Sequence, residues 1–166
     1  MMRRALFLGM ACVLAALQAT GAPEGAPAGL ATAAQHAARA KLLYEEGFYQ
    51  LLPEHARAQA QAKFALAERE SLAAIRLDPT HEPAYRQLAR IYAAQKRFAD
   101  VIDVYRDILR MHPDDVDLRV QLADLLSQQE RYAEALDELH TARGYTDDAH
   151  ALSEIDRFTR LVQQAL

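Results

Sequence analysis

The sequence has very little cysteine and, beyond its first thirty residues, very little glycine. Cys12 is the only cysteine, so no disulfide bond can form within the chain, and the redox compartment cannot be inferred from cysteine pairing. Because Cys12 lies in an N-terminal apolar run, the rest of the chain has no thiolate nucleophile and no cysteine metal ligand. After Leu30 only Gly47 and Gly144 remain. Gly-rich phosphate loops are therefore absent, and nucleotide binding by that route is not expected.

Alternating runs of β-branched residues are also absent, which argues against a sheet. The dominant residues are alanine, leucine, glutamate, glutamine and arginine, all of which favour helices. The 166 residues, of which 51% are hydrophobic, suffice for one domain with a buried core. The composition therefore predicts an all-α protein.

An excess of basic residues is missing as well. The formal net charge is −4, and setting residues 1–30 aside leaves 17 basic and 22 acidic residues. A mildly acidic body has no electrostatic footprint for nucleic acid or for an anionic membrane surface. No nucleic-acid partner is therefore expected.

The N-terminus has the order of a secretory signal: a short basic start, an apolar run and then small residues. Ala5 to Leu17 is an unbroken apolar run of 13 residues, shorter than the roughly 20 that a membrane span needs. We expect a signal peptide at residues 1–22, with Ala19-Thr20-Gly21 as the cleavage motif, and a periplasmic or secreted protein. One alternative is an uncleaved segment that anchors the protein in the inner membrane. Another is acylation at Cys12, although Gly9 stands where a lipoprotein signal has leucine.

Apolar residues recur along the chain at an offset of 34 residues. Pro79 and Pro113 lie 34 residues apart, and each ends a helical run. The same shift aligns further pairs of similar residues: Leu88 with Leu122, Ala89 with Ala123, Phe98 with Tyr132, Ala99 with Ala133, Val101 with Ala135 and Tyr105 with Leu139. A fixed period of this length indicates a repeat protein.

The period and the residue pattern resemble the tetratricopeptide repeat. One copy reads Tyr85-x2-Leu88-Ala89-x2-Tyr92, Val101-x3-Tyr105 and Pro113, and the next reads Leu122-Ala123-x2-Leu126 and Ala135-x3-Leu139. The resemblance implies a right-handed superhelical solenoid of antiparallel helix pairs, with about three repeats and a C-terminal capping helix. Its small residues would allow close helix contacts, and its large residues would fill the spaces between helices. The expected repeat core comprises Tyr85, Leu88, Ala89, Tyr92, Phe98, Val101, Tyr105, Ile108, Pro113, Leu122, Ala123, Leu126, Tyr132, Ala135, Leu139 and Ala142.

The expected organisation is a flexible spacer at residues 23–30, rich in proline and glycine, and a repeat domain at residues 31–166. The parts of the repeat domain are a divergent repeat with an insertion (31–81), two regular repeats (82–115 and 116–147) and a capping helix (148–166). The divergent repeat is expected to begin with a helix from Ala31 to Gln50. Leu51 to Lys63 would be the insertion, in which Pro53 could start a long helix running to Leu77.

Three residues depart from the family pattern. Arg119 occupies the place where Tyr85 sits one repeat earlier, and Lys96 and Glu130 stand in turns where the family usually has glycine. We expect these departures to loosen the packing without changing the fold.

Few side chains are arranged for catalysis or metal binding. The serines of the body fall in predicted helices, without the sharp turn of a nucleophile elbow, and no two histidines are spaced i, i+4 on one helix. The pairs Asp114-Asp115 and Asp147-Asp148 are interpreted as helix caps, with Asp114 and Asp117 spaced like a capping box. We expect no enzyme activity, no cofactor, no metal and no small-molecule substrate.

In the family that the sequence resembles, the first helix of each repeat lines a concave face. The matching positions form the expected partner-binding groove: Arg86, Arg90, Ala93, Val120, Gln121, Asp124, Ser127 and Gln128. Arg86 and Arg90 lie one turn apart and can clamp a carboxylate or phosphate through bidentate hydrogen bonds. The alternative is a solvated face on which arginine stems cover apolar surface. Some family members clamp a partner's C-terminal carboxylates with a lysine and two asparagines, but the asparagines are missing here and Asp124 intrudes.

The sequence therefore predicts an extracytoplasmic scaffold that presents a helical groove to a segment of a partner protein. A self-associating structural solenoid is the alternative. An enzyme, or an accessory subunit of one, is the third hypothesis.

Overall fold

Every regular element in the described part of the protein is an α-helix. The computed structural model describes residues 31–50 and 56–165, and the helical repeat region forms one compact unit that begins at Thr32. The helices are α2 (Ala33–Gln50), α3 (Arg57–Leu77), α4 (Glu82–Ala94), α5 (Phe98–Met111), α6 (Val116–Gln128), α7 (Tyr132–Arg143) and α8 (Ala149–Ala165).

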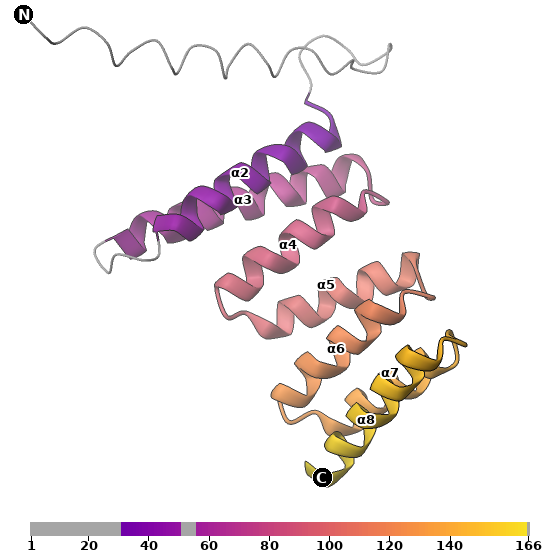
Figure 1. The fold of residues 1–166 in the computed structure, drawn as a ribbon. Helices are drawn as coiled ribbons and strands as arrows, with labels where there is room; N and C mark the ends of the chain where they lie inside the picture. The colour runs from indigo at the N-terminus through magenta and orange to yellow at the C-terminus, as the bar shows by residue number, and fades with distance from the viewer. Residues whose placement is uncertain (1–30, 51–55, 166) are drawn as a thin grey trace, which may run out of the picture. The chain divides into compact units, whose positions relative to one another are not determined.

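These helices form consecutive antiparallel pairs that stack side by side (Figure 1). α2 packs against α3, α4 against α5, and α6 against α7, while α5 also packs against α6 and so joins the second pair to the third. α8 lies against α7 at the C-terminal end. The first pair joins the second through contacts of both α2 and α3 with α4. The prediction of an all-α helical-repeat solenoid is therefore confirmed.

The largest hydrophobic cluster runs through the two regular helix pairs and into α8. Eleven of the residues expected in the repeat core are buried: Leu88, Ala89, Tyr92, Val101, Ile108, Leu122, Ala123, Leu126, Ala135, Leu139 and Ala142. The four aromatic residues Tyr85, Phe98, Tyr105 and Tyr132 are partly buried and pack against this cluster. Pro113 is exposed, since it follows α5 and ends that helix rather than filling the core.

The first pair is joined to α4 by two smaller clusters. Phe64 and Ile91 are buried together with the alanines of α3, and Leu43 and Tyr44 of α2 pack against them. Ala37, Ala74 and Ala84 form the other cluster, one from each of α2, α3 and α4. Because alanine has only a methyl side chain, three helix backbones can approach closely at this point.

The helices of the first pair are the longest in the described residues. α2 has 18 residues and α3 has 21, against 12 to 14 in the four helices that follow. Residues 57–63, expected to belong to an insertion, form the first turns of α3. Pro53, the candidate start of this helix, lies outside the described residues.

Lys96 and Glu130 occupy equivalent turns within the two regular pairs. Both residues have a backbone φ of 59°, in the left-handed region that favours glycine. After α4 the N–H of Lys96 donates to the carbonyl of Ala93 and that of Arg97 to Tyr92. Glu130 and Arg131 repeat the same two bonds to Ser127 and Leu126. This is the hydrogen-bond pattern of a Schellman motif, which explains why the family usually places glycine here.

The predicted capping box at Asp114 is wrong by one residue. Asp115 is the N-cap of α6, and its Oδ1 accepts a hydrogen bond of 2.9 Å from the backbone N–H of Leu118. The second aspartate pair behaves similarly, because Asp148 accepts a hydrogen bond of 2.8 Å from the N–H of Ala151 at the start of α8.

Arg119 makes the same contact as the tyrosine that it replaces. The hydroxyl of Tyr85 donates to the carbonyl of Pro79 over 3.1 Å, and the guanidinium of Arg119 donates to the carbonyl of Pro113 over 2.7 and 3.0 Å. Arg119 also pairs with Glu138 at 2.9 Å, and its side chain is only 12% exposed. The expectation that this departure loosens the packing is therefore wrong at this position.

The expected signal peptide and spacer lie outside the described residues. In the part of the protein that the structure does describe, no helix has the length and apolar character needed to cross a bilayer.

Candidate functional site

The residues of the expected partner-binding groove lie on α4 and α6, the first helices of the two regular pairs. Most of them are exposed or half-buried polar residues, and Ala93 is exposed as well. Val120 is half-buried and packs against the main hydrophobic cluster, so its side chain is partly committed to the core.

The polar residues of α6 are satisfied by one another. Gln128 donates from Nε2 to Asp124 Oδ2 over 2.8 Å, and Ser127 donates from Oγ to the carbonyl of Asp124 over the same distance. This stretch of the groove therefore has few donors or acceptors waiting for a partner.

Arg86 and Arg90 do not form an equivalent pair. Arg86 donates to Glu82 on its own helix and, from Nη2, to Asp115 Oδ2 at 3.0 Å. The hydrogen bond to Glu82, with a further contribution from Asp115, raises the pKa of Arg86. Two carboxylates thus compensate one guanidinium. Arg90 has no ion pair within the described residues.

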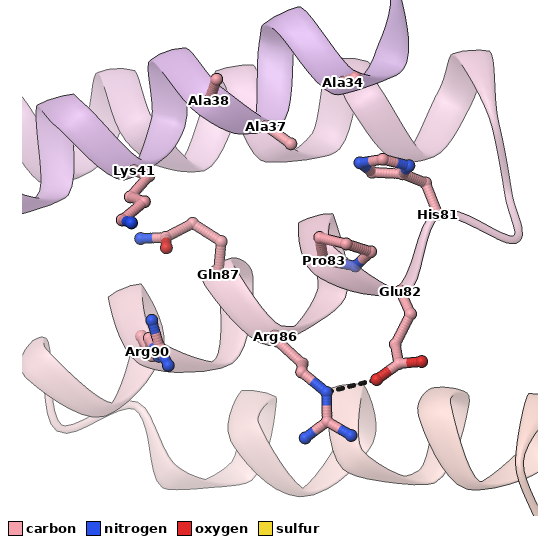
Figure 2. A pocket seen from close by; sticks show the side chains of 10 residues that line it. All are labelled: Ala34, Ala37, Ala38, Lys41, His81, Glu82, Pro83, Arg86, Gln87 and Arg90. Carbon is pink, nitrogen blue, oxygen red and sulfur yellow. Dashed lines mark hydrogen bonds and ion pairs between the residues drawn. The ribbon is translucent and has the colours of Figure 1, made fainter.

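A pocket of about 470 Å³ opens between α2 and α4 (Figure 2). Three alanines of α2 line one wall: Ala34, Ala37 and Ala38. α4 and the turn before it supply most of the polar lining, which includes Arg86, Gln87 and Arg90, and Lys41 completes the lining from α2. One part of the expected groove, Arg86 with Arg90, therefore lines a concave site.

The pocket is basic and contains a buried donor without a partner. Gln87 is only 5% exposed, and its Nε2 has no hydrogen-bond partner within the described residues. Lys41 is exposed and, like Arg90, forms no ion pair there. Glu82 supplies the one carboxylate of the lining, and it is engaged by Arg86 and by His112 Nε2 at 3.1 Å.

Sequence reasoning missed Lys41 and Gln87. Gln87 was within reach, because it lies 34 residues before Gln121, which the groove prediction includes. Lys41 was not, since its helix belongs to the divergent repeat and has no register with the later copies. Only the packing of α2 against α4 places Lys41 beside Gln87.

Metal chemistry finds no support in the described residues, which include no group of three or more histidine, cysteine, aspartate or glutamate side chains placed to hold an ion. Ser71 is fully buried, and its Oγ has no hydrogen-bond partner among them. A serine that is closed off from solvent in this way has no access to a substrate.

The fold defines a class of protein, the α-helical repeat solenoid, and its relatives narrow the class further. Residues 93–154 match the tetratricopeptide repeat family. The protein belongs to the tetratricopeptide-repeat family. A comparison with curated protein sequences found no match.

Solved structures of low sequence identity share this fold. The TPR2B domain of yeast Sti1, in a complex with pHsp70, superimposes with a TM-score of 0.54 at 20% identity, over 79% of this protein and 98% of that one. The type III secretion translocator chaperone SycD of Yersinia enterocolitica gives 0.52 at 17% identity, over 75% and 83%. SycD in complex with a peptide of the translocator YopD gives 0.50 at 19% identity, over 75% and 89%.

Proposed function

We propose that this protein is a non-catalytic scaffold that binds a segment of a partner protein along its first helices. The observation that carries the proposal is the pocket of about 470 Å³ between α2 and α4, lined by small residues on one side and by charged residues on the other. Stacked helix pairs generate extended binding surfaces of this kind. Two of the structures with the same fold were solved with a peptide or protein partner, which supports the same mode here.

The described residues offer little to a catalytic alternative. The pocket lining contains one carboxylate, one imidazole and no nucleophile, and Glu82 is held by Arg86 and His112. A general base must be within hydrogen-bond reach of the proton that it removes, and an ion pair with a neighbour competes with that role. Binding is the function that this arrangement supports best.

We further propose that the scaffold works outside the cytoplasm. The support is the basic, apolar and small-residue order of residues 1–22. Intact-mass analysis of protein recovered from the periplasm tests this point. A mature N-terminus between residues 20 and 23 is expected, and a full-length protein found only in the cytoplasm would contradict it.

The binding proposal is tested by affinity capture from an envelope fraction with three tagged proteins. These are the wild type, Lys41→Glu combined with Arg90→Glu, and the control Arg160→Glu. Arg160 is exposed on α8 and has no ion pair among the described residues, so its reversal matches the chemistry away from the pocket. A partner held by the wild type and the control but lost from the double variant is expected. The same partner held equally by all three would remove the pocket from the proposal.

Self-association is separated from scaffolding by light scattering over a range of concentrations. A scaffold is expected to keep the mass of one molecule, 18.5 kDa before any processing. A mass that rises towards multiples of this value, with no partner captured, would instead favour the self-associating solenoid.

A further inference from the structure

We propose that the pocket between α2 and α4 binds a carboxylate group of the partner segment, held by Lys41, Gln87 and Arg90. The inference rests on the proposed scaffold function and adds the chemistry of what is bound. The carboxylate comes from an aspartate or glutamate side chain of the partner, or from the partner's own C-terminus.

The first argument is a buried donor that has no acceptor. Gln87 is 5% exposed, and its Nε2 finds no partner among the described residues. Buried amide groups in folded proteins are nearly always hydrogen-bonded, because an unmade bond loses the hydration that the group had in the unfolded state. An amide that lines a pocket and lacks a partner is therefore completed by an acceptor that enters the pocket.

The second argument is that two donors face each other. Figure 2 shows the amide nitrogen of Gln87 turned toward the ammonium group of Lys41, with no acceptor drawn between them. An ammonium group has only donors, and the amide nitrogen likewise donates. An oxygen anion between the two accepts from both, which a cation in the same place does not.

The third argument is charge. Lys41 and Arg90 are cationic and have no ion pair among the described residues, although the protein as a whole is acidic. Glu82 cannot neutralise them, because Arg86 and His112 already engage both of its oxygens. Hydrogen bonds to a charged acceptor are roughly twice as strong as neutral ones, so an anion gains most from this donor set.

The fourth argument concerns size. A cavity of about 470 Å³ is larger than a single carboxylate, and its α2 wall carries Ala34, Ala37 and Ala38. Small side chains leave room for the backbone that carries the acid. A carboxylate is also the one anionic group that an unmodified protein segment ordinarily offers, which favours it over a phosphoryl group.

The experiment follows the side-chain amide of Gln87 by ¹H–¹⁵N NMR in the full-length protein during titration with short peptides. The probes are acetyl-triglutamate amide, acetyl-triglutamine amide, and acetyl-triglutamine with a free C-terminal carboxylate. The Gln87 resonances are expected to shift with the first or the third probe and to stay still with the second. The probe that acts identifies the source of the carboxylate. Equal behaviour with all three probes would overturn the inference.

The Gln87→Met variant separates a binding role from a structural one. Methionine keeps the approximate length of the side chain but removes the donor, so affinity for the active probe is expected to fall about tenfold. The midpoint of thermal unfolding is expected to stay the same or to rise, because the unsatisfied buried group is gone. A lower midpoint with unchanged affinity would show that Gln87 only supports the fold, and would overturn the inference.

Lys41→Met tests the cation, with Arg160→Met as the matched control. About a tenfold loss of probe affinity is expected for Lys41→Met and none for Arg160→Met. If a captured partner survives while the acidic probes fail to shift Gln87, the scaffold stands and the carboxylate site falls. If the probes act but no partner is captured, the site stands and the scaffold falls.

Discussion

At the scale of single residues, Lys96 and Glu130 carry the clearest strain in the described residues. Each has a φ of 59° and occupies the left-handed position of a Schellman motif. An L-residue other than glycine loses about 1–2 kcal/mol in this conformation because its Cβ crowds a backbone oxygen. Glycine avoids that clash but loses about 0.5–1 kcal/mol through its greater freedom in the unfolded state. The clash is the larger effect.

Lys96→Gly and Glu130→Gly are therefore each expected to raise the free energy of unfolding by about 0.5–1 kcal/mol. Urea denaturation of the single variants measures this. Gln129→Gly is the control, since residue 129 has a φ of −95° and glycine relieves no clash there. A fall in stability for Lys96→Gly as large as that of the control would refute the assignment.

Glu134 lies at the centre of an ion-pair network between α5 and α7. Arg131 donates to its two carboxylate oxygens, each over 2.7 Å, and Arg106 donates to Oε2 over 2.7 Å. The hydrogen bonds from Arg131, followed by the one from Arg106, lower the pKa of Glu134 to about 2 from an ordinary value of 4.5. The side chain is 43% exposed, so solvent and salt screen much of this interaction.

A depressed pKa stabilises the folded state only while the carboxylate is ionised. The contribution of Glu134 is complete above pH 4.5 and is lost as the pH falls toward 2. The stability difference between the wild type and Glu134→Gln is therefore expected to shrink over this window. Urea midpoints at several pH values measure it, and added salt is expected to reduce it. Asp137→Asn, at an exposed position on α7, controls for loss of an acid, and a pH-independent difference would contradict the prediction.

At the scale of elements, α2 and α3 approach each other closely at Gly47. A Cβ built on Gly47 would lie 3.0 Å from Cε1 of Phe64, 3.1 Å from Cβ of Lys63 and 3.2 Å from the carbonyl oxygen of Ala60. A backbone oxygen and a Cβ cannot swing aside as the end of a long, flexible side group does. This close approach, rather than any special backbone angle, accounts for a glycine inside a helix.

Gly47→Ala is expected to lower the free energy of unfolding by about 1 kcal/mol. The substitution gains about 1 kcal/mol of helix propensity, but overpacking costs about 1–3 kcal/mol. Thermal unfolding followed by circular dichroism measures the net effect. Gly144→Ala is the matched control, because its Cβ would meet one atom at 3.4 Å, and it is expected to be neutral or stabilising. If both substitutions stabilise, the close approach of the two helices is not as tight as described.

At the scale of the whole repeat unit, each helix pair contacts mainly its neighbours. Stability in such a stack is approximately a sum of local terms, so damage at one end stays near that end. α8 covers the last pair through Ile155 and Val162, which are 2% and 3% exposed. Phe158 is half-buried against the same cluster, whereas Leu161 is 55% exposed on the outer side.

Ile155→Ala is therefore expected to cost about 2–4 kcal/mol, because it empties a buried site. Amide hydrogen exchange is expected to accelerate in α7 and α8 and to change little in α2 and α3. Leu161→Ala, on the exposed side of the same helix, is expected to stay within about 0.5 kcal/mol of the wild type. Uniform acceleration over all helices would show that the stack unfolds as one cooperative block.

The 34-residue register explains how much of the fold was predictable. A repeat places its core positions, its helix ends and its turns at fixed offsets, so Leu88 and Leu122, or Lys96 and Glu130, are recognised as equivalent from their spacing alone. The cap at Asp115 was missed by only one residue. Where the register fails, at the divergent first pair, the length of α3 and the neighbours of α2 were not predictable in the same way.

The sequence by itself determined the helical class, the repeat period and the residues that fill the regular pairs, since these depend on local propensity and periodic burial. Only the tertiary structure decided which cations have partners. Arg86 meets Asp115, 29 residues away at the start of the next pair, and Arg90 does not. Likewise only the packing of α2 against α4 brings Lys41 to the buried amide of Gln87. Contacts of this kind depend on side-chain direction across an interface between helices, which has no period along the sequence.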